Sequence, residues 1–234
     1  MRKEVTGMNY YETDPEFMER FEHFAYDEVV HEEGQQLEEP VRYLAILATL
    51  MGCQGKEEFK RVLPKALKGG LTPVMIKELV YQAVDYLGIG RVLPFLDAVN
   101  QAFEEQGIAL PLEGQATTTM EDRLEKGAQA QVEIFGEGMR EAWKNGHINR
   151  WLAANCFGDY YTRKGLALKQ RELITFCFLA AQGGCEPQLT AHAKGNMNLG
   201  NDKEFLIKVV SQCLPYIGYP RSLNAITCIN KAAE

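Results

Sequence analysis

The chain of 234 residues repeats itself at a spacing of about 130 residues, and this repeat constrains the fold more than any other feature. Residues 70–100 and 200–230 match at a constant offset, in the pairs Gly70/Gly200, Gln82/Gln212, Tyr86/Tyr216, Gly88/Gly218, Arg91/Arg221, Leu93/Leu223 and Asn100/Asn230. Unrelated helices share leucines readily, but they do not readily share Tyr-x-Gly-x-x-Arg with an asparagine nine residues later. Three further pairs match at an offset of 129 residues, namely Arg42/Arg171, Leu44/Leu173 and Leu50/Leu179. The sequence therefore predicts a tandem duplication.

The repeated units have a helical pattern almost throughout. Residues 41–51 are apolar nearly all round, which is typical of a core helix. Thr72-Pro73 is an N-cap followed by a first-turn proline, and the apolar pattern that follows it runs to Gly88. Further helices are expected at 91–106, 120–145, 147–162, 168–182, 186–198, 202–216 and 219–232. No alternating strand pattern is present, so we predict an all-α fold with repeats at 15–106 and 120–232, joined by a Gly- and Thr-rich linker at 107–119.

Charge and composition exclude several classes of protein. Lys and Arg minus Asp and Glu gives 25 − 32 = −7, and no basic run is present, so nucleic-acid binding is not expected. No stretch approaches the roughly 20 apolar residues of a membrane helix, and residues 1–14 lack the apolar run of a signal peptide, so we expect a cytoplasmic protein. Residues 1–39 hold 12 acids and 3 bases, which predicts a solvated helix face, with a partner-binding arm as the alternative.

The six cysteines, at positions 53, 156, 177, 185, 213 and 228, show no paired spacing. Structural zinc sites bring their ligands in close pairs, so we predict no metal and no cofactor. A chain with this large a core does not need a disulfide framework. We expect most of the thiols to be small buried hydrophobic groups, with one or two reactive at most.

The candidate catalytic side chains lie in the second half of the chain. Gly183-Gly184 ends one predicted helix and Pro187 begins the next, which places Cys185 at a helix N-terminus, where the dipole should lower the pKa of its thiol. His192 lies two helical turns further on, and Glu172 faces this junction if the two helices form an antiparallel hairpin. A thiol, an imidazole and a carboxylate would suit an activated nucleophile or a proton relay. The alternative is an inert thiol beside a hydrogen-bonded packing histidine.

The segment RELITFCFLAAQGGCEPQLTAHAKGNMNLG, followed by PYIGYPRSLNA, resembles the carboxymuconolactone decarboxylase family, and specifically its tandem-repeat members. The preceding FGDYYTRKGLALKQRELI is similar to the lead-in of the same domain. The resemblance covers about 15–105 and 120–232. It implies an all-helical fold around an antiparallel helix hairpin, assembled as a homo-oligomer, for instance a trimer.

The family has two enzymatic activities, and each is a possible function for this chain. Its alkylhydroperoxidase D branch uses Cys-x-x-Cys, a histidine and a glutamate, which the resemblance assigns here to Cys185, His192 and Glu172. Gln188 stands where the second cysteine would be, so a peroxidase here would need an external thiol reductant or another cysteine of the chain. The decarboxylase branch releases carbon dioxide from a carboxylated lactone and needs no thiol.

Three hypotheses follow. The first is a thiol-dependent hydroperoxide reductase with peroxiredoxin-type antioxidant activity, in which Cys185 is the nucleophile and Glu172 and His192 relay protons. The second is a decarboxylating lyase that uses His192 and Glu172, with Cys185 as a bystander. The third is a non-catalytic oligomer that binds a small molecule or a protein. The sequence favours the first.

Four further residues are secondary candidates. Gln188 and Tyr160 could line the substrate pocket. Arg163 or Arg171 could bind a substrate carboxylate, although a structural salt bridge is the better prediction for Arg171 because Arg42 matches it.

Overall fold

The computed structural model describes residues 9–234, so the signal-peptide prediction for residues 1–14 lies in part outside the described residues. No strand occurs in residues 9–234, and the all-α prediction is confirmed. The α-helices are α1 (Tyr10–Thr13), α2 (Pro15–His23), α3 (Val29–His31), α4 (Glu39–Gly52), α5 (Lys56–Lys68), α6 (Pro73–Leu87), α7 (Ile89–Glu105), α8 (Arg123–Phe135), α9 (His147–Trp151), α10 (Leu168–Gln182), α11 (Glu186–Asn198) and α12 (Lys203–Ala233). Two segments are π-helical, η1 (Phe24–Glu28) and η4 (Leu152–Tyr161), and two short 3-10 turns are η2 (Glu137–Met139) and η3 (Ala142–Lys144).

The predicted helix ends are explained by local chemistry. The Thr72 side chain accepts a hydrogen bond from the Met75 amide at the start of α6, and the Asp202 side chain does the same for Phe205 at the start of α12. Gly88 ends α6 with a φ of 78°, and Gly218 interrupts α12 with a φ of 75°, a conformation that favours glycine. The repeated order of helices, with α12 taking the place of α6 and α7, supports the proposal of a tandem duplication.

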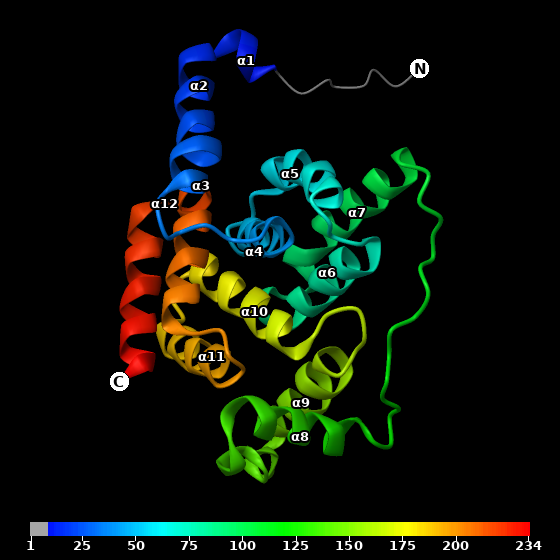
Figure 1. Cartoon of the computed structure of the whole chain (residues 1–234). Helices are drawn as coiled ribbons and strands as arrows, with labels where there is room; N and C mark the ends of the chain where they lie inside the picture. The colour runs from blue at the N-terminus through cyan, green and yellow to red at the C-terminus, as the bar shows by residue number, and fades with distance from the viewer. Residues whose placement is uncertain (1–8) are drawn as a thin grey trace.

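Helices α4 and α10 lie at the centre of the molecule (Figure 1). The C-terminal ends of α4 and α10 approach each other closely. A Cβ on Gly52 would lie only 2.7 Å from the Cβ of Ala181, so only glycine fits there. One hydrophobic core runs through residues of both halves, from Tyr43 to Ala232. The two halves therefore share their main core, and a smaller cluster between α8 and η4 lies within the second half.

Two reciprocal hydrogen bonds tie the halves together. Nε of Arg42 donates to Oε1 of Gln212 at 2.8 Å, and Nη1 of Arg171 donates to Oε1 of Gln82 at 2.9 Å. Each half thus supplies the glutamine that the arginine of the other half binds. All four side chains are buried, so this exchange satisfies polar groups that would otherwise be costly inside the core.

Other predictions are refined by the structure. The segment predicted as a linker, 107–119, contains no helix and runs along the outside of the molecule from α7 to α8 (Figure 1). The expected helix at 120–145 is shorter and ends at Phe135, where Gly136 adopts a φ of 94°. The sequence patterns did not predict helix α5. None of the helices in residues 9–234 is long and apolar enough to cross a membrane.

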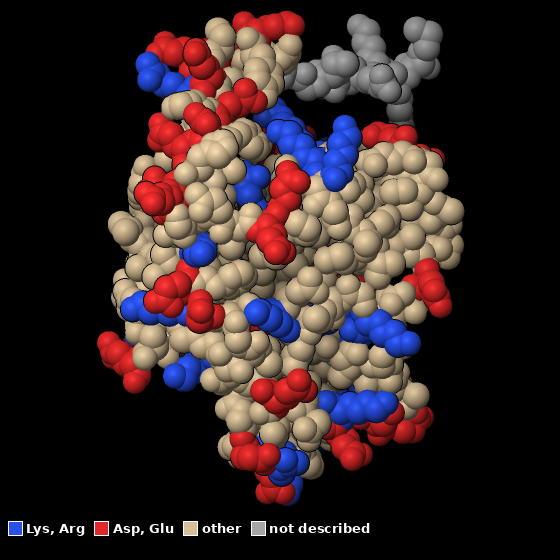
Figure 2. Space-filling view, in the orientation of Figure 1, with Lys and Arg blue, Asp and Glu red and all other residues tan. Residues whose placement is uncertain are grey.

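Acidic side chains gather over the N-terminal helices, at the top of the view in Figure 2. Helices α1 and α2 project from the body of the molecule (Figure 1). Phe17 is 70% exposed, whereas Met18 is buried, so only part of the apolar stripe of α2 packs against the core. A cavity of about 470 Å³ lies beneath α2, between α4, α5 and α12, and none of the predicted site residues lines it.

Candidate functional site

The centre of the candidate site is a buried carboxylate–imidazole pair between two helices. Nδ1 of His192, on α11, lies 2.9 Å from Oε2 and 3.2 Å from Oε1 of Glu172, on α10. The Glu172 side chain is fully buried and the His192 side chain is 11% exposed. The structure therefore brings together two of the three residues that the sequence singled out.

Close packing of α10 against α11 makes this pair possible. Gly195, one turn after His192, faces Glu172, and a Cβ there would lie 2.8 Å from Oε2 of Glu172 and 2.8 Å from Cγ2 of Ile134. The buried side chain of Asn196 donates from Nδ2 to the backbone oxygens of Glu172 and His192, at 2.9 and 2.8 Å. These contacts fix the distance between the two helices and with it the distance between carboxylate and imidazole.

The second oxygen of Glu172 is held by a tyrosine that the sequence did not single out. The Tyr161 hydroxyl donates to Oε1 of Glu172 at 2.8 Å. Because its one proton is used there, the Tyr161 oxygen accepts from Thr175 at 2.6 Å and from Tyr86 at 2.8 Å. Burial raises the pKa of both tyrosines, with the Glu172 charge adding to the effect, so the two hydroxyls stay protonated donors.

Tyr161 reaches Glu172 from the end of a π-helix. Segment η4 packs against α8 so closely that a Cβ on Gly127 would overlap the Ala153 carbonyl, and a Cβ on Gly158 would overlap the Arg123 carbonyl. π-helical turns in proteins are often found at functional sites. Tyr160, the residue that the sequence singled out, is only half-buried, and no hydrogen bond joins it to the pair within residues 9–234.

The His192 ring is clamped between aromatic side chains. Tyr86 and Phe135 meet it edge to face, with ring centroids at 5.7 and 5.4 Å. Since Nδ1 faces Glu172, Nε2 is the ring nitrogen without a hydrogen-bond partner among residues 9–234. Glu172 fixes the orientation of the ring and would stabilise an imidazolium, which leaves Nε2 to exchange a proton with a bound molecule.

Cys185 lies apart from this pair, and the expected convergence of three groups is wrong for the thiol. Its Sγ contacts the Leu179 carbonyl at 3.5 Å and the Gln182 amide nitrogen at 3.7 Å, and neither Glu172 nor His192 is within hydrogen-bond distance. The expected lowering of its pKa is also wrong. Burial raises the pKa of the Cys185 thiol, and the nearby Glu186 charge acts in the same direction, outweighing the hydrogen bond from Gln182.

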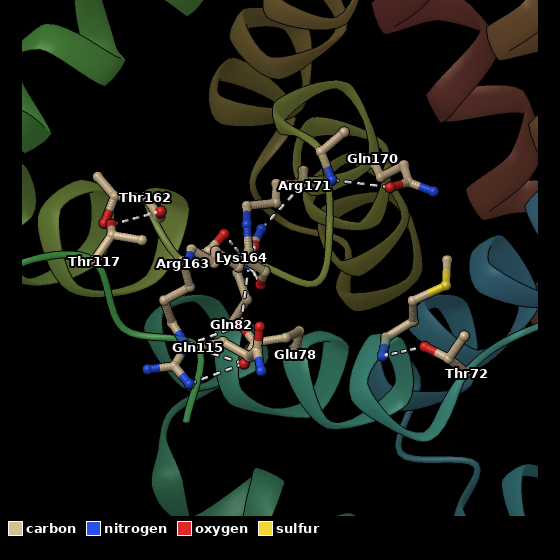
Figure 3. Close-up of polar contacts among 12 residues, drawn as sticks. Thr72, Glu78, Gln82, Gln115, Thr117, Thr162, Arg163, Lys164, Gln170 and Arg171 are labelled. Atoms are coloured by element: carbon tan, nitrogen blue, oxygen red, sulfur yellow. Dashed lines mark hydrogen bonds and ion pairs between the residues drawn. The ribbon is translucent and has the colours of Figure 1, made fainter. Parts of the chain in front are cut away.

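The two arginines that the sequence proposed as substrate ligands share another partner (Figure 3). Arg163 holds the Glu78 carboxylate with Nε at 2.8 Å, and Nη2 of Arg171 lies 3.0 Å from the same carboxylate. Arg171 and Glu78 are almost fully buried. The structural prediction for Arg171 agrees with this geometry, and Arg163 is committed to the same cluster rather than available to a substrate.

Gln188 is exposed on the first turn of α11, and its side chain makes no hydrogen bond within the described part of the chain. Cys177 is buried beside Cys213 and Thr49, away from Glu172. No group of three or more His, Cys, Asp or Glu in residues 9–234 is arranged to hold a metal ion.

The candidate residues lie in the part of the chain that matches known proteins. Residues 147–231, which contain Tyr161, Glu172, Cys185 and His192, match the model of the carboxymuconolactone decarboxylase family. A curated relative, 4-carboxymuconolactone decarboxylase of Acinetobacter baylyi (strain ATCC 33305 / BD413 / ADP1), is 27% identical over 116 residues, which cover 44% of this chain and 80% of the relative. The second half of the chain, over residues 147–231, is therefore similar to the carboxymuconolactone decarboxylase family.

Proposed function

We propose that the protein is a decarboxylating lyase that acts on a small carboxylated lactone, the second of the three sequence hypotheses. The observation that carries this proposal is the buried Glu172–His192 pair, in which Nε2 is the ring nitrogen left without a hydrogen-bond partner by residues 9–234. The curated relative that the chain resembles is named as an enzyme of this kind.

The reaction needs one proton. When the carbon–carboxylate bond breaks, carbon dioxide leaves and the electron pair of that bond enters the conjugated lactone. A ring carbon then accepts a proton, and the double bond has moved. His192 supplies that proton from Nε2, while Glu172 keeps a proton on Nδ1 and stabilises the imidazolium before transfer. Tyr161 holds Glu172 in place through the other carboxylate oxygen.

A thiol-dependent hydroperoxide reductase, which the sequence favoured, has less support. Peroxide reduction needs a thiolate, and the raised pKa of Cys185 disfavours one. The nearest proton-transfer pair also lies out of hydrogen-bond distance of its Sγ. An external thiol reductant belongs to that alternative alone, and the trimeric assembly stays a prediction.

The test compares two variants on two substrates. With 4-carboxymuconolactone, the wild type should release carbon dioxide, His192→Ala should lose about 10²–10⁴-fold in rate, and Cys185→Ser should keep most of it. With an organic hydroperoxide and a dithiol, none of the three proteins should turn over. The proposal is overturned if the wild type reduces the peroxide, Cys185→Ser abolishes that activity, and no lactone is decarboxylated. Circular dichroism of each variant controls for folding.

A further inference from the structure

The phenol of Tyr86 extends the hydrogen-bonded chain that holds Glu172. The Tyr86 and Tyr161 hydroxyls lie 2.8 Å apart, and Tyr161 donates its only proton to Oε1 of Glu172. Tyr86 is therefore the donor to Tyr161. The Tyr86 oxygen accepts in turn from the thiol of Cys156, on η4, at 3.5 Å. Three donors thus point in the same direction, from Cys156 toward the carboxylate that pairs with His192.

Asp85 lies at the far end of this chain. Its carboxyl interacts with the Cys156 thiol. Oδ2 of Asp85 is buried and has no hydrogen-bond partner among residues 9–234, so a charge on this carboxyl is poorly solvated. Burial raises the pKa of Asp85 to about 7, against the opposing hydrogen bond of Cys156 and with a further increase from the Asp159 charge.

The titratable groups that face Asp85 come from η4. Cys156 and Asp159 act on the Asp85 charge directly, and Tyr160 lies close enough for that charge to act on it. Helices α4, α7 and α10 also pack against α6, but none of their titratable groups in residues 9–234 shifts the pKa of Asp85. Asp159 is itself paired with Arg123. The protonation of Asp85 therefore depends on burial, on one thiol and on one neighbouring carboxylate.

The proton on Asp85 determines where the thiol proton of Cys156 points. Protonated Asp85 is a donor, so Sγ of Cys156 accepts from it and keeps its own proton for Tyr86. Ionised Asp85 is only an acceptor, and hydrogen bonds to a charged acceptor are stronger than those to a neutral one. The thiol proton then turns toward Asp85, and the Tyr86 oxygen loses its donor.

We propose that Asp85 is a positioning residue for the Glu172–His192 pair, which it supports in its protonated form through the Cys156 thiol and the Tyr86 phenol. This inference rests on the proposed function. Tyr86 is the point of contact, because its ring meets the His192 ring edge to face at 5.7 Å while its hydroxyl reaches Tyr161. Ionisation of Asp85 slows proton transfer from Nε2 without preventing it.

The internal repeat shows that this corner of the fold forms without such a carboxyl. Tyr86 and Tyr216 occupy equivalent positions, each two residues before a glycine with a positive φ. Pro215 precedes Tyr216, where Asp85 precedes Tyr86. Tyr216 packs against Phe21 rather than against a histidine ring. The carboxyl is thus present beside the tyrosine that contacts the catalytic pair and absent beside its counterpart.

The first experiment measures decarboxylation of 4-carboxymuconolactone by the wild type and Asp85→Asn between about pH 5.5 and 8.5. The amide cannot ionise, and its nitrogen can donate to Sγ at every pH. Any titration of His192 is common to both proteins and cancels in the ratio of their kcat values. The ratio of Asp85→Asn to wild type should rise about 3–10-fold across this range, as expected for one hydrogen bond, with a midpoint near pH 7.

Asp97→Asn is the matched control, because Asp97 is an exposed carboxylate on α7. Its kcat relative to the wild type should not change with pH. A ratio for Asp85→Asn that is equally flat would overturn the inference.

Cys156→Ala tests whether the effect travels through the thiol. Without Sγ, Asp85 loses its link to Tyr86, so adding Asp85→Asn to Cys156→Ala should give a kcat ratio that does not change with pH. A ratio that still rises about 3–10-fold would mean that the Asp85 charge acts through space, and the proposed chain would be wrong. Circular dichroism at each pH checks the fold, since removing a buried thiol leaves a small cavity.

NMR of protein labelled with 15N-histidine separates this inference from the proposed function, because it needs no turnover. The Nδ1–H resonance of His192, assigned by its loss in His192→Gln, should shift with a midpoint near pH 7 in the wild type, and Asp85→Asn should lack that step. A step that depends on Asp85, in a protein that does not decarboxylate the lactone, would keep the inference and sink the lyase. Absence of the step would overturn the role of Asp85, whether or not the lactone is turned over.

Discussion

The carboxylate of Glu172 joins His192 to Tyr161, with one oxygen 2.9 Å from the imidazole Nδ1 and the other 2.8 Å from the tyrosine hydroxyl. A fully buried carboxylate with one imidazole partner and one hydroxyl donor is held in a single orientation. These contacts orient the His192 ring, as a positioned proton donor requires.

Tyr161→Phe tests the role of the hydroxyl. The ring stays, but Glu172 loses a hydrogen bond in the core, so we expect the decarboxylation rate to fall about tenfold while the fold persists. The pH–rate profile should shift as well, since a structural role alone would leave it unchanged. Tyr160→Phe, at the half-buried neighbour, is the matched control and should leave both rate and profile near wild type.

Gly195→Ala tests the close approach of α10 and α11. A Cβ at this position would crowd Oε2 of Glu172 and the Ile134 side chain, so the free energy of unfolding should fall by about 1–3 kcal/mol, and the lyase rate should fall with it. Gly90→Ala is the control, because the position is helical and open. It should be neutral, or more stable by up to about 1 kcal/mol, in urea unfolding.

Arg171→Met tests the buried ion cluster. Glu78 would keep only Arg163, and Gln82 would lose its donor, so we expect a loss of about 3–5 kcal/mol in the free energy of unfolding. The double variant Glu78→Leu/Arg171→Met removes both buried charges and should recover part of that loss. A double variant no more stable than Arg171→Met would show that packing, rather than the unpaired charge, causes the loss.

Asp85→Asn tests a carboxyl group outside the catalytic pair. Burial raises the pKa of Asp85 to about 7, and the Asp159 charge adds to this, while Cys156 opposes it through a hydrogen bond. The unfolded chain releases this proton near pH 4, so between about pH 4 and 7 the folded state holds more protons and loses stability as pH rises. The contribution is on the order of 4 kcal/mol.

The amide of Asp85→Asn cannot ionise. We therefore expect Asp85→Asn to gain stability relative to the wild type as pH increases from 4 to 8, with no further gain above about pH 8. Urea unfolding at several pH values measures this difference. A difference that does not change with pH would show that Asp85 titrates normally.

Much of the fold was predictable because it depends on local chemistry. The cap of Thr72, the positive φ of Gly88 and the apolar surface of 41–51 are each determined by a few neighbouring residues. The facing of Glu172 and His192 was predictable for the same reason, since their spacing places them on adjacent helices that join at a tight turn. The sequence repeat also identified Arg42/Arg171 and Gln82/Gln212 as equivalent residues. It could not show that each arginine binds the glutamine of the other half.

The sequence by itself determined an all-helical chain, the helix ends, and a carboxylate–imidazole pair in the second half. The tertiary structure decided which other groups surround that pair. Tyr86 lies 106 residues before His192 in the sequence, and Tyr161, at the end of the π-helical η4, reaches Glu172 where Tyr160 does not. Arg163 is paired with Glu78, and the Cys185 thiol is partly buried, which raises its pKa. Contacts between distant segments and the loss of water depend on packing of the whole chain, and no local pattern encodes them.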